Sequence, residues 1–329
     1  MKWITARRRH PLAGYVVVIL ALALFGVGYA ALAPTTDQAQ AQTLAADAPS
    51  PEDVDVAEGR EIFDQTCATC HNYDGSGMRT EDGDVIGPDL REVGPAAIDF
   101  QVSTGRMPSA NPDAQMPRKP MAMSEEDLVN LIAYYNAQIR DGQSGADIPY
   151  DVPDTAPQRD EFSVNRADFD SEEEYEEAVE AAEAEYEAAL EEYEAEYEAY
   201  IAGADDTELG MKLYLTNCAH CHSWSGGGGA LTDGRWAPQI RDASAREIYE
   251  AMVTGPGAMP MFSDTVITSD EKQELISYVK TLEAEPNAGG VFDLARVGQV
   301  AEGFISWTIG LALIIACAIW ITAKQRAHD

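Results

Sequence analysis

The chain has 329 residues and a formal net charge of -35, from 57 acidic and 22 basic residues. This charge repels phosphates, so we expect no nucleic-acid partner. The length suggests two domains, because a domain usually holds about 100 to 200 residues.

The first predicted element is an apolar helix within residues 1–33. Residues 12–32 carry no charge, and about 20 residues suffice for a helix to cross a membrane. Lys2 and three arginines before this helix place the N-terminus in the cytoplasm by the positive-inside rule. A cleavable signal peptide is the alternative, because small Ala-rich residues follow, although the apolar run is longer than usual for a signal peptide. Both interpretations export the chain that follows.

Two stretches of the exported segment have the composition of folded domains, residues 53–140 and 207–285. Residues 34–52 are rich in Ala, Gln, Pro and Thr and lack a hydrophobic period, which is typical of a tether. Residues 286–302 form a further linker after the second domain.

The two predicted domains repeat one another. Each ends in a capping signal followed by an apolar helix, Ser124 with Asp127 in the first copy and Thr268 with Glu271 in the second. The other matching pairs are Gly59 and Gly210, Phe63 and Tyr214, Pro88 and Pro238, Thr104 and Thr254, and Met107 and Met259. We therefore expect two tandem copies of one all-α fold.

Residues 141–206, between the two domains, combine a Pro-containing linker with an acidic helix. The stretch 171–200 contains fourteen Glu and no basic residue, and its tyrosines recur at helical spacing on one face. We interpret it as an exposed helical spacer, extended by repulsion between its carboxylates. The alternative is a docking surface in which the tyrosine stripe contacts a partner subunit.

A second apolar helix is predicted at residues 303–322, before the tail 323–329. It carries no charge, has Trp307 and Trp320 near its ends, and precedes a basic tail, as a membrane span with a cytoplasmic end does. We expect a multi-pass protein of the cell membrane, with both termini in the cytoplasm and both domains on the extracytoplasmic side. Cys317 within this helix is interpreted as a packing residue.

The remaining four cysteines form two Cys-x-x-Cys-His motifs, which is the attachment signature of c-type haem. The motifs are Cys67-Ala-Thr-Cys70-His71 and Cys218-Ala-His-Cys221-His222. Two thiols one helical turn apart can reach the two vinyl groups, and the adjacent histidine becomes the proximal ligand of the iron. The sequence therefore predicts two covalently bound haems c.

Paired cysteines have three other common uses: a thioredoxin-like dithiol, a zinc site and a pair of disulfides. All three are disfavoured, because the histidine follows immediately in both copies and the rest of the repeat accompanies it. His220, between the cysteines of the second motif, is expected to face solvent.

The sixth iron ligand is expected from a methionine in each copy. Met107 lies 36 residues after His71, and Met259 lies 37 residues after His222, each before a proline in a loop that contains Thr and Gly. A His/Met ligand pair raises the iron potential, which suits a carrier in the upper part of a respiratory chain. The competing methionines are Met116, Met121 and Met123 in the first copy and Met261 in the second.

With these residues the chain resembles the dihaem cytochrome c subunit of the actinobacterial-type cytochrome bcc complex, a menaquinol–cytochrome c reductase. The stretches that carry the resemblance are Gly87-Pro88-Asp89-Leu90, Gly105-Arg106-Met107-Pro108, Pro117-Arg118-Lys119-Pro120, Thr254-Gly255-Pro256 and Ala258-Met259-Pro260. The acidic insert departs from the family.

The resemblance implies a subunit whose first haem accepts electrons from the Rieske iron–sulfur protein and whose second haem passes them to cytochrome c oxidase. It implies partners in a supercomplex: the cytochrome b subunit, the Rieske subunit and oxidase subunits. The expected fold is two tandem class I cytochrome c domains between two transmembrane helices. The chain is then an electron carrier within a translocase, with no catalytic residue of its own.

Two rival functions were considered. A dihaem subunit of a cbb-type oxidase or of a membrane dehydrogenase is the alternative, although such subunits usually carry their anchor elsewhere. A dihaem peroxidase needs one haem with an open distal side, and two equivalent methionine loops argue against it.

Overall fold

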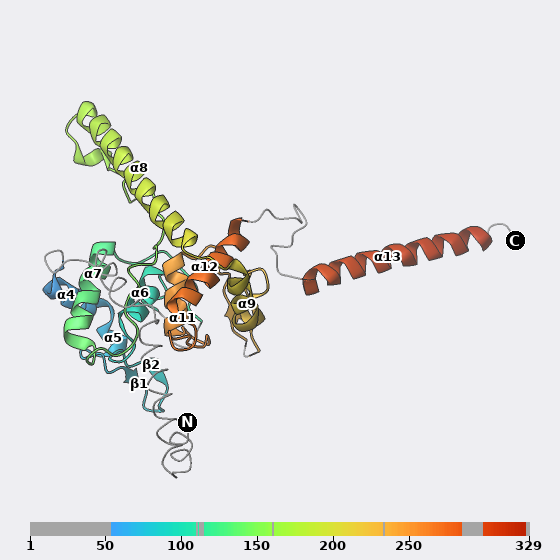
Figure 1. Cartoon of the computed structure of the whole chain (residues 1–329), viewed down its shortest axis with the longest axis horizontal. Coiled ribbons are helices and arrows are strands. Elements are labelled where there is room, and N and C mark those ends of the chain that lie inside the picture. The colour runs from blue at the N-terminus through green and yellow to red at the C-terminus, as the bar shows by residue number, and fades with distance from the viewer. Residues whose placement is uncertain are drawn as a thin grey trace, which may run out of the picture. The chain divides into compact units, whose positions relative to one another are not determined.

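The computed structural model describes residues 54–109, 111, 115–159, 161–232, 234–284 and 299–326. The predicted first membrane helix and the tether lie outside the described residues, as does most of the linker at 286–302. The described part is mostly helical, with two short antiparallel hairpins (Figure 1).

The first helix group runs from α4 to η1. It consists of α4 (Val56–Thr66), α5 (Ala68–His71), the hairpin β1 (Met78–Arg79) and β2 (Val85–Gly87), α6 (Pro95–Ser103), α7 (Glu125–Tyr134) and the π-helical turn η1 (Tyr135–Ile139). Its core contains Phe63, Val102, Leu128, Leu131, Ile132 and Tyr135.

The second helix group runs from α9 to α12 and has the same order of elements. It consists of α9 (Thr207–Asn217), α10 (Ala219–His222), the hairpin β3 (Gly229–Ala230) and β4 (Trp236–Ala237), α11 (Ala245–Thr254) and α12 (Ser269–Ala284). Its core contains Tyr214, Ile248, Met252, Leu275, Ile276 and Val279.

The last helix of each group begins where the sequence predicts. Ser124 accepts a hydrogen bond from the Asp127 backbone N–H, and Asp127 accepts one from the Ser124 backbone N–H, so the capping box is complete. Thr268 and Glu271 exchange the same two hydrogen bonds, of 2.9 and 3.3 Å, at the start of α12. Both predicted helix starts are confirmed.

A glycine lets the first and last helices of each group cross closely. A Cβ atom on Gly59 would lie 1.9 Å from the carbonyl oxygen of Asn130, and one on Gly210 would lie 2.1 Å from that of Glu274. One turn further along, the rings of Phe63 and Tyr134 are 5.6 Å apart. The matching rings in the second group, those of Tyr214 and Tyr278, are 5.5 Å apart. The repeated Gly and aromatic residues are thus the contact points of one helix crossing.

The acidic insert forms the 31-residue helix α8 (Glu172–Ala202), which begins after the N-cap Ser171 and contains no buried residue. The preceding chain, with the 3-10 turn η2 (Arg166–Asp168), returns alongside it (Figure 1). Arg159 forms a 2.6 Å ion pair with Glu183, and the Phe162 ring lies edge-on to Tyr186 at 5.6 Å. The long helix is confirmed, and the chain's own linker covers part of its tyrosine stripe.

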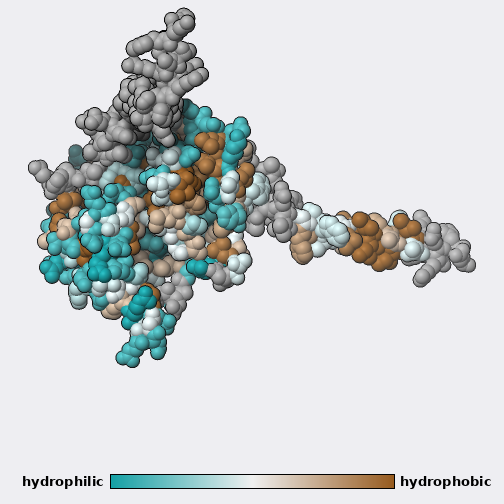
Figure 2. Space-filling view, turned by 60° about the horizontal axis from the view of Figure 1, so that its bottom comes forward, coloured by the Kyte–Doolittle hydropathy of each residue, from teal (hydrophilic) through white to brown (hydrophobic). Residues whose placement is uncertain are grey.

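The chain ends in α13 (Gln299–Arg326). Its stretch Gly303–Thr322 is long and apolar enough to cross a membrane, with a mean hydropathy of 2.3. Figure 2 shows hydrophobic residues along this helix. By length and composition it matches the predicted C-terminal span.

Candidate haem-binding sites

Both Cys-x-x-Cys-His motifs form one short helical turn at the end of a longer helix. The Cys67 backbone N–H donates to the Phe63 carbonyl at 2.9 Å, and the His71 N–H donates to the Cys67 carbonyl at 3.0 Å. The same bonds in the second motif join Cys218 to Tyr214 at 2.8 Å and His222 to Cys218 at 2.9 Å. The two thiols of each motif therefore lie one helical turn apart, as haem attachment requires.

The described residues include all five cysteines of the chain. None of them forms a disulfide. Within that part, no group of three or more His, Cys, Asp or Glu side chains could hold a metal ion.

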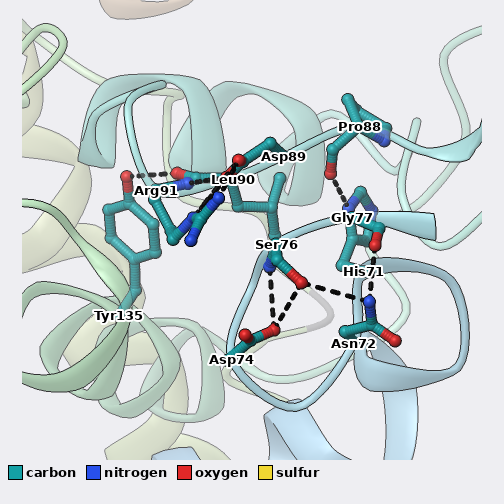
Figure 3. A network of polar contacts seen from close by, with 10 residues as sticks. All are labelled: His71, Asn72, Asp74, Ser76, Gly77, Pro88, Asp89, Leu90, Arg91 and Tyr135. Atoms are coloured by element: carbon teal, nitrogen blue, oxygen red, sulfur yellow. Dashed lines mark hydrogen bonds and ion pairs between the residues drawn. The ribbon is translucent and has the colours of Figure 1, made fainter.

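Each motif histidine is fixed by a hydrogen bond to a proline carbonyl. His71 Nδ1 lies 2.8 Å from the Pro88 oxygen (Figure 3), and His222 Nδ1 lies 2.9 Å from the Pro238 oxygen. Because a carbonyl can only accept, Nδ1 must donate, which leaves Nε2 with its lone pair free to bind a metal.

Both motif histidines are buried, and for His222 this burial favours the neutral form. His71 and His222 are 8% and 9% exposed. Burial lowers the pKa of His222, and the bond to Pro238 opposes this change only in part. A neutral imidazole with one free nitrogen is the ligand that haem iron accepts.

Polar contacts order both the loop after His71 and the segment after Pro88 (Figure 3). Asn72 adopts a φ of 60° and donates to the Gly77 carbonyl at 2.5 Å. The hydroxyl of Tyr135 donates to the Leu90 carbonyl at 2.9 Å and accepts from the Gly94 N–H at 3.0 Å. The segment that follows Pro88 is thereby attached to the end of α7.

Each predicted methionine ligand packs at the same hydrophobic core as the first cysteine of its motif. Met107 and Cys67 both pack against the core of the first helix group, and Met259 and Cys218 both belong to the core region of the second. Met121 and Met123 also pack against the first core. Met261 is 62% exposed, which disfavours it as a competitor of Met259.

A cavity of about 450 Å³ contains all four predicted site residues of the second motif, which are Cys218, Cys221, His222 and Met259. Its size falls within the range of about 300 to 1,000 Å³ that is typical of cofactor sites. Two thiols, an oriented imidazole and a thioether in one cavity fit the chemistry of haem c.

The first helix group supplies part of the wall of this cavity, which the sequence did not predict. The contributing side chains include Phe100, Gln101, Arg106, Met116 and Arg118. Met116, a competitor for the first site by its position in the sequence, thus lines the second. Arg106 stands out in the sequence as the residue directly before Met107. Nothing in the sequence shows that its side chain faces the second helix group.

The chain is similar in sequence to known proteins over nearly its whole length. Residues 54–134 and 205–279 match the family described as cytochrome C oxidase, cbb3-type, subunit III. The chain is 32% identical to the cytochrome bc1 complex cytochrome c subunit of Corynebacterium diphtheriae, over 98% of this chain and 99% of that protein.

The chain belongs to the family of cytochrome bc1 complex cytochrome c subunits. The relative from Corynebacterium efficiens is also 32% identical, over 96% of this chain and 90% of that protein. The relative from Mycobacterium tuberculosis is 31% identical, over 97% of this chain and 93% of that protein. The resemblance inferred from the motifs is thereby confirmed. These matches run nearly end to end and so include the region of α8, which neither segment of the cbb3-type match covers.

Proposed function

We propose that this cytochrome c subunit of a bc-type complex carries two haems c and passes single electrons through them in sequence. The observation that carries the proposal is the repeated motif histidine, held by a proline carbonyl at 2.8 and 2.9 Å with Nε2 free. Each of the two buried imidazoles is thus oriented to bind one iron atom.

Each predicted site residue then has one role. The cysteines Cys67, Cys70, Cys218 and Cys221 bind the haem vinyl groups as thioethers, and His71 and His222 are the proximal iron ligands. Met107 and Met259 are the distal ligands. The haems supply one-electron chemistry when bound, and the chain holds them, orients them and excludes water.

The electron path proposed is from the Rieske iron–sulfur protein to the first haem, then to the second haem and to cytochrome c oxidase. The cytochrome b, Rieske and oxidase subunits are the partners, in a menaquinol–cytochrome c reductase joined to its oxidase. Two class I cytochrome c folds are proposed for the two helix groups, on the extracytoplasmic side. The helix α13 and the predicted helix in residues 1–33 anchor them in the membrane.

The proposal is tested first on the purified chain. A pyridine haemochrome assay should give two haems c per chain, one after Cys67→Ala with Cys70→Ala, and one after Cys218→Ala with Cys221→Ala. A single haem in the unaltered chain would contradict the proposal.

The partners are tested by mild-detergent purification of the tagged chain from its own membranes. We expect a cytochrome b subunit, a Rieske protein and oxidase subunits to co-purify. Recovery of a cbb-type catalytic subunit or a dehydrogenase instead would support the alternative that the match to cbb3-type subunit III raises.

A further inference from the structure

Arg106 is a half-buried cation that forms no ion pair among the described residues, although the charge of Glu247 acts on it. Its Nη1 atom is buried and has no hydrogen-bond partner among the described residues. Its guanidinium lies over the ring of Phe100, with 4.7 Å from Cζ to the ring centroid, and it lines the cavity that contains Cys218 and His222. An arginine stays charged in a protein, so an unpaired buried guanidinium is costly unless a ligand completes it.

The charges around the cavity single out Arg106. The charged or titratable side chains that line it, besides those of the predicted ligands and thiols, are Arg106, Arg118, Arg235, His220 and Glu247. Arg118 forms a 2.6 Å ion pair with the buried Glu247, and Arg235 has an interaction of its own. Glu247 also accepts a hydrogen bond from the Ser244 N–H at 3.0 Å, so its carboxylate is already shared.

A haem bound at the second motif would bring the missing carboxylates. Its two vinyl groups are committed to Cys218 and Cys221, and its two propionates lie on the other edge of the macrocycle. The propionates would therefore lie away from the motif, and guanidinium groups are the preferred protein partners of carboxylates.

We infer that Arg106, from the first helix group, binds a propionate of the haem held by the second, so that the second haem site is incomplete without the first. The inference rests on the proposed attachment of two haems. Arg106 directly precedes Met107, the proposed distal ligand of the first haem. One short segment then contacts both haems, and the redox state of one site can influence the other through it.

The test is a spectroelectrochemical titration of the full-length chain with both haems attached. Arg106→Gln should lower the midpoint potential of the second haem, because an unneutralised propionate favours the oxidised iron. We expect about a tenfold change in the one-electron equilibrium constant, or ~59 mV. The step of the second haem is assigned in Met259→His, whose stronger nitrogen donor lowers that potential alone.

Two variants separate this role from a general structural one. Arg106→Lys keeps the charge and should recover most of the potential. Arg159→Gln removes a charge that is paired with Glu183 on α8, away from the cavity, and should change neither potential. An unchanged second potential in Arg106→Gln, or a shift confined to the first haem, would overturn the inference.

A haem-loaded structure provides a second measurement that does not depend on any variant folding. We expect an Arg106 nitrogen within about 3.2 Å of a propionate oxygen of the second haem. A separation beyond 4 Å from both propionates refutes the role of Arg106 while leaving the two-haem proposal intact. One haem per chain in the unaltered protein would instead refute the proposed function itself.

Discussion

A single hydrogen bond at each motif histidine decides which ring nitrogen is free. The acceptors are the carbonyls of Pro88 and Pro238, 17 and 16 residues beyond their histidines. Proline suits this position because it has no N–H to compete and its fixed φ stiffens the segment that presents the carbonyl. Each free Nε2 could then bind the iron of the proposed haem, with Met107 or Met259 as the proposed ligand on the opposite side.

Replacement of the two methionines tests that opposite ligand. We expect Met107→Ala to remove the weak near-infrared methionine-to-iron absorbance of one oxidised haem, and Met259→Ala to remove that of the other. The reason is that thioether sulfur produces this band and alanine supplies no ligand. Visible and near-infrared spectra of the oxidised chain, with haem content checked, measure the effect.

The controls for this prediction come from the other methionines at the two sites. Met121 packs against the first core, and Met261 is exposed. Replacement of either residue by alanine should therefore leave the band unchanged. Met116 and Met259 both line the cavity of the second motif. If Met116→Ala rather than Met259→Ala removes the second band, the assignment of the second ligand is wrong.

Only part of these two sites could be predicted from the sequence, and the reason is physical. Cys67, His71 and their counterparts are close in sequence, and local helix geometry suffices to place them. The pairing of Pro88 with Pro238 revealed the repeat but not the hydrogen bond, because a backbone carbonyl leaves no residue signature. Arg106 and Met116 line the cavity of the second motif because the two helix groups pack together. No local sequence pattern encodes that packing.

At the scale of elements, each helix group depends on one close crossing of its first and last helices. Gly59 against Asn130 and Gly210 against Glu274 leave no room for a Cβ atom. The obstacle in both cases is a backbone carbonyl, which cannot move without shifting the whole helix. The crossing in turn holds the helix that ends in the haem-binding motif.

Gly210→Ala should therefore destabilise the second helix group despite the better helix propensity of alanine. We expect a loss of roughly 2 to 4 kcal/mol in the free energy of unfolding, from overpacking at the crossing. Urea denaturation followed by circular dichroism measures it. Gly203→Ala is the matched control, because the atom nearest its Cβ would be the movable end of the Gln273 side chain, and the Tyr200 carbonyl oxygen would lie at an ordinary contact distance of 3.4 Å. Equal losses in both variants would show that the crossing is not tight.

The helix α8 shows what a periodic pattern can and cannot predict. Its tyrosine period located the helix and its aromatic face, and its start at Ser171 agrees with the sequence. What covers that face depends on contacts such as Arg159 with Glu183, 24 residues apart, which periodicity does not report. The guanidinium of Arg159 also lies 4.9 Å above the ring of Tyr186.

Removal of the linker contacts should release the linker and leave α8 helical. In the double variant Arg159→Ser with Phe162→Ser, we expect faster proteolysis within residues 155–170, because the ion pair and the ring contact both disappear. Limited proteolysis with mass spectrometry measures the cleavage rate, and Arg60→Ser, in an exposed i,i+4 pair on α4, is the control. An unchanged rate would mean that these contacts do not hold the linker.

At the scale of the whole molecule, α6 of the first helix group packs against α11 of the second. Arg118 pairs with Glu247 at 2.6 Å across this contact, and the Gln115 side chain exchanges hydrogen bonds of 2.6 and 2.9 Å with the Trp236 backbone. The same contact buries two carboxyl groups, Asp99 at 8% and Glu250 at 1% exposure. The contact between the two helix groups thus contains two carboxyl groups that can titrate.

The buried pair gives this contact a dependence on pH. Burial raises the pKa of Asp99 to about 6, against an opposing hydrogen bond from Glu250. Burial, and then the charge of Asp99, raise the pKa of Glu250 well above its ordinary value. Of the other charged groups nearby, Asp154 raises both pKa values, Arg246 lowers both, and Glu125 raises that of Asp99.

The sign of the effect follows from the proton balance. Both carboxyls hold protons in the folded chain at a pH where the unfolded chain has released them, since unfolded Asp and Glu titrate near 4. Stability is therefore fully present below about pH 4 and is lost as pH rises through 6, the folded pKa of Asp99. Titration of Glu250 extends the loss to higher pH.

Asp99→Asn should accordingly flatten the fall in stability between pH 5 and pH 8, because asparagine keeps the shape and can donate a hydrogen bond to Glu250 without ionising. The shift of Asp99 corresponds to roughly 2 to 3 kcal/mol at full ionisation, and about half of this loss falls between pH 5 and pH 8, which urea denaturation at the two pH values can measure. Asp89→Asn is the control: the side-chain hydrogen bond with Arg91 lowers the pKa of Asp89 to about 2, so this carboxyl stays ionised from pH 5 to pH 8. The control should lower stability alike at both pH values and leave the slope unchanged. A slope in Asp99→Asn as steep as in the unaltered chain would show that this pair does not govern the contact between the helix groups.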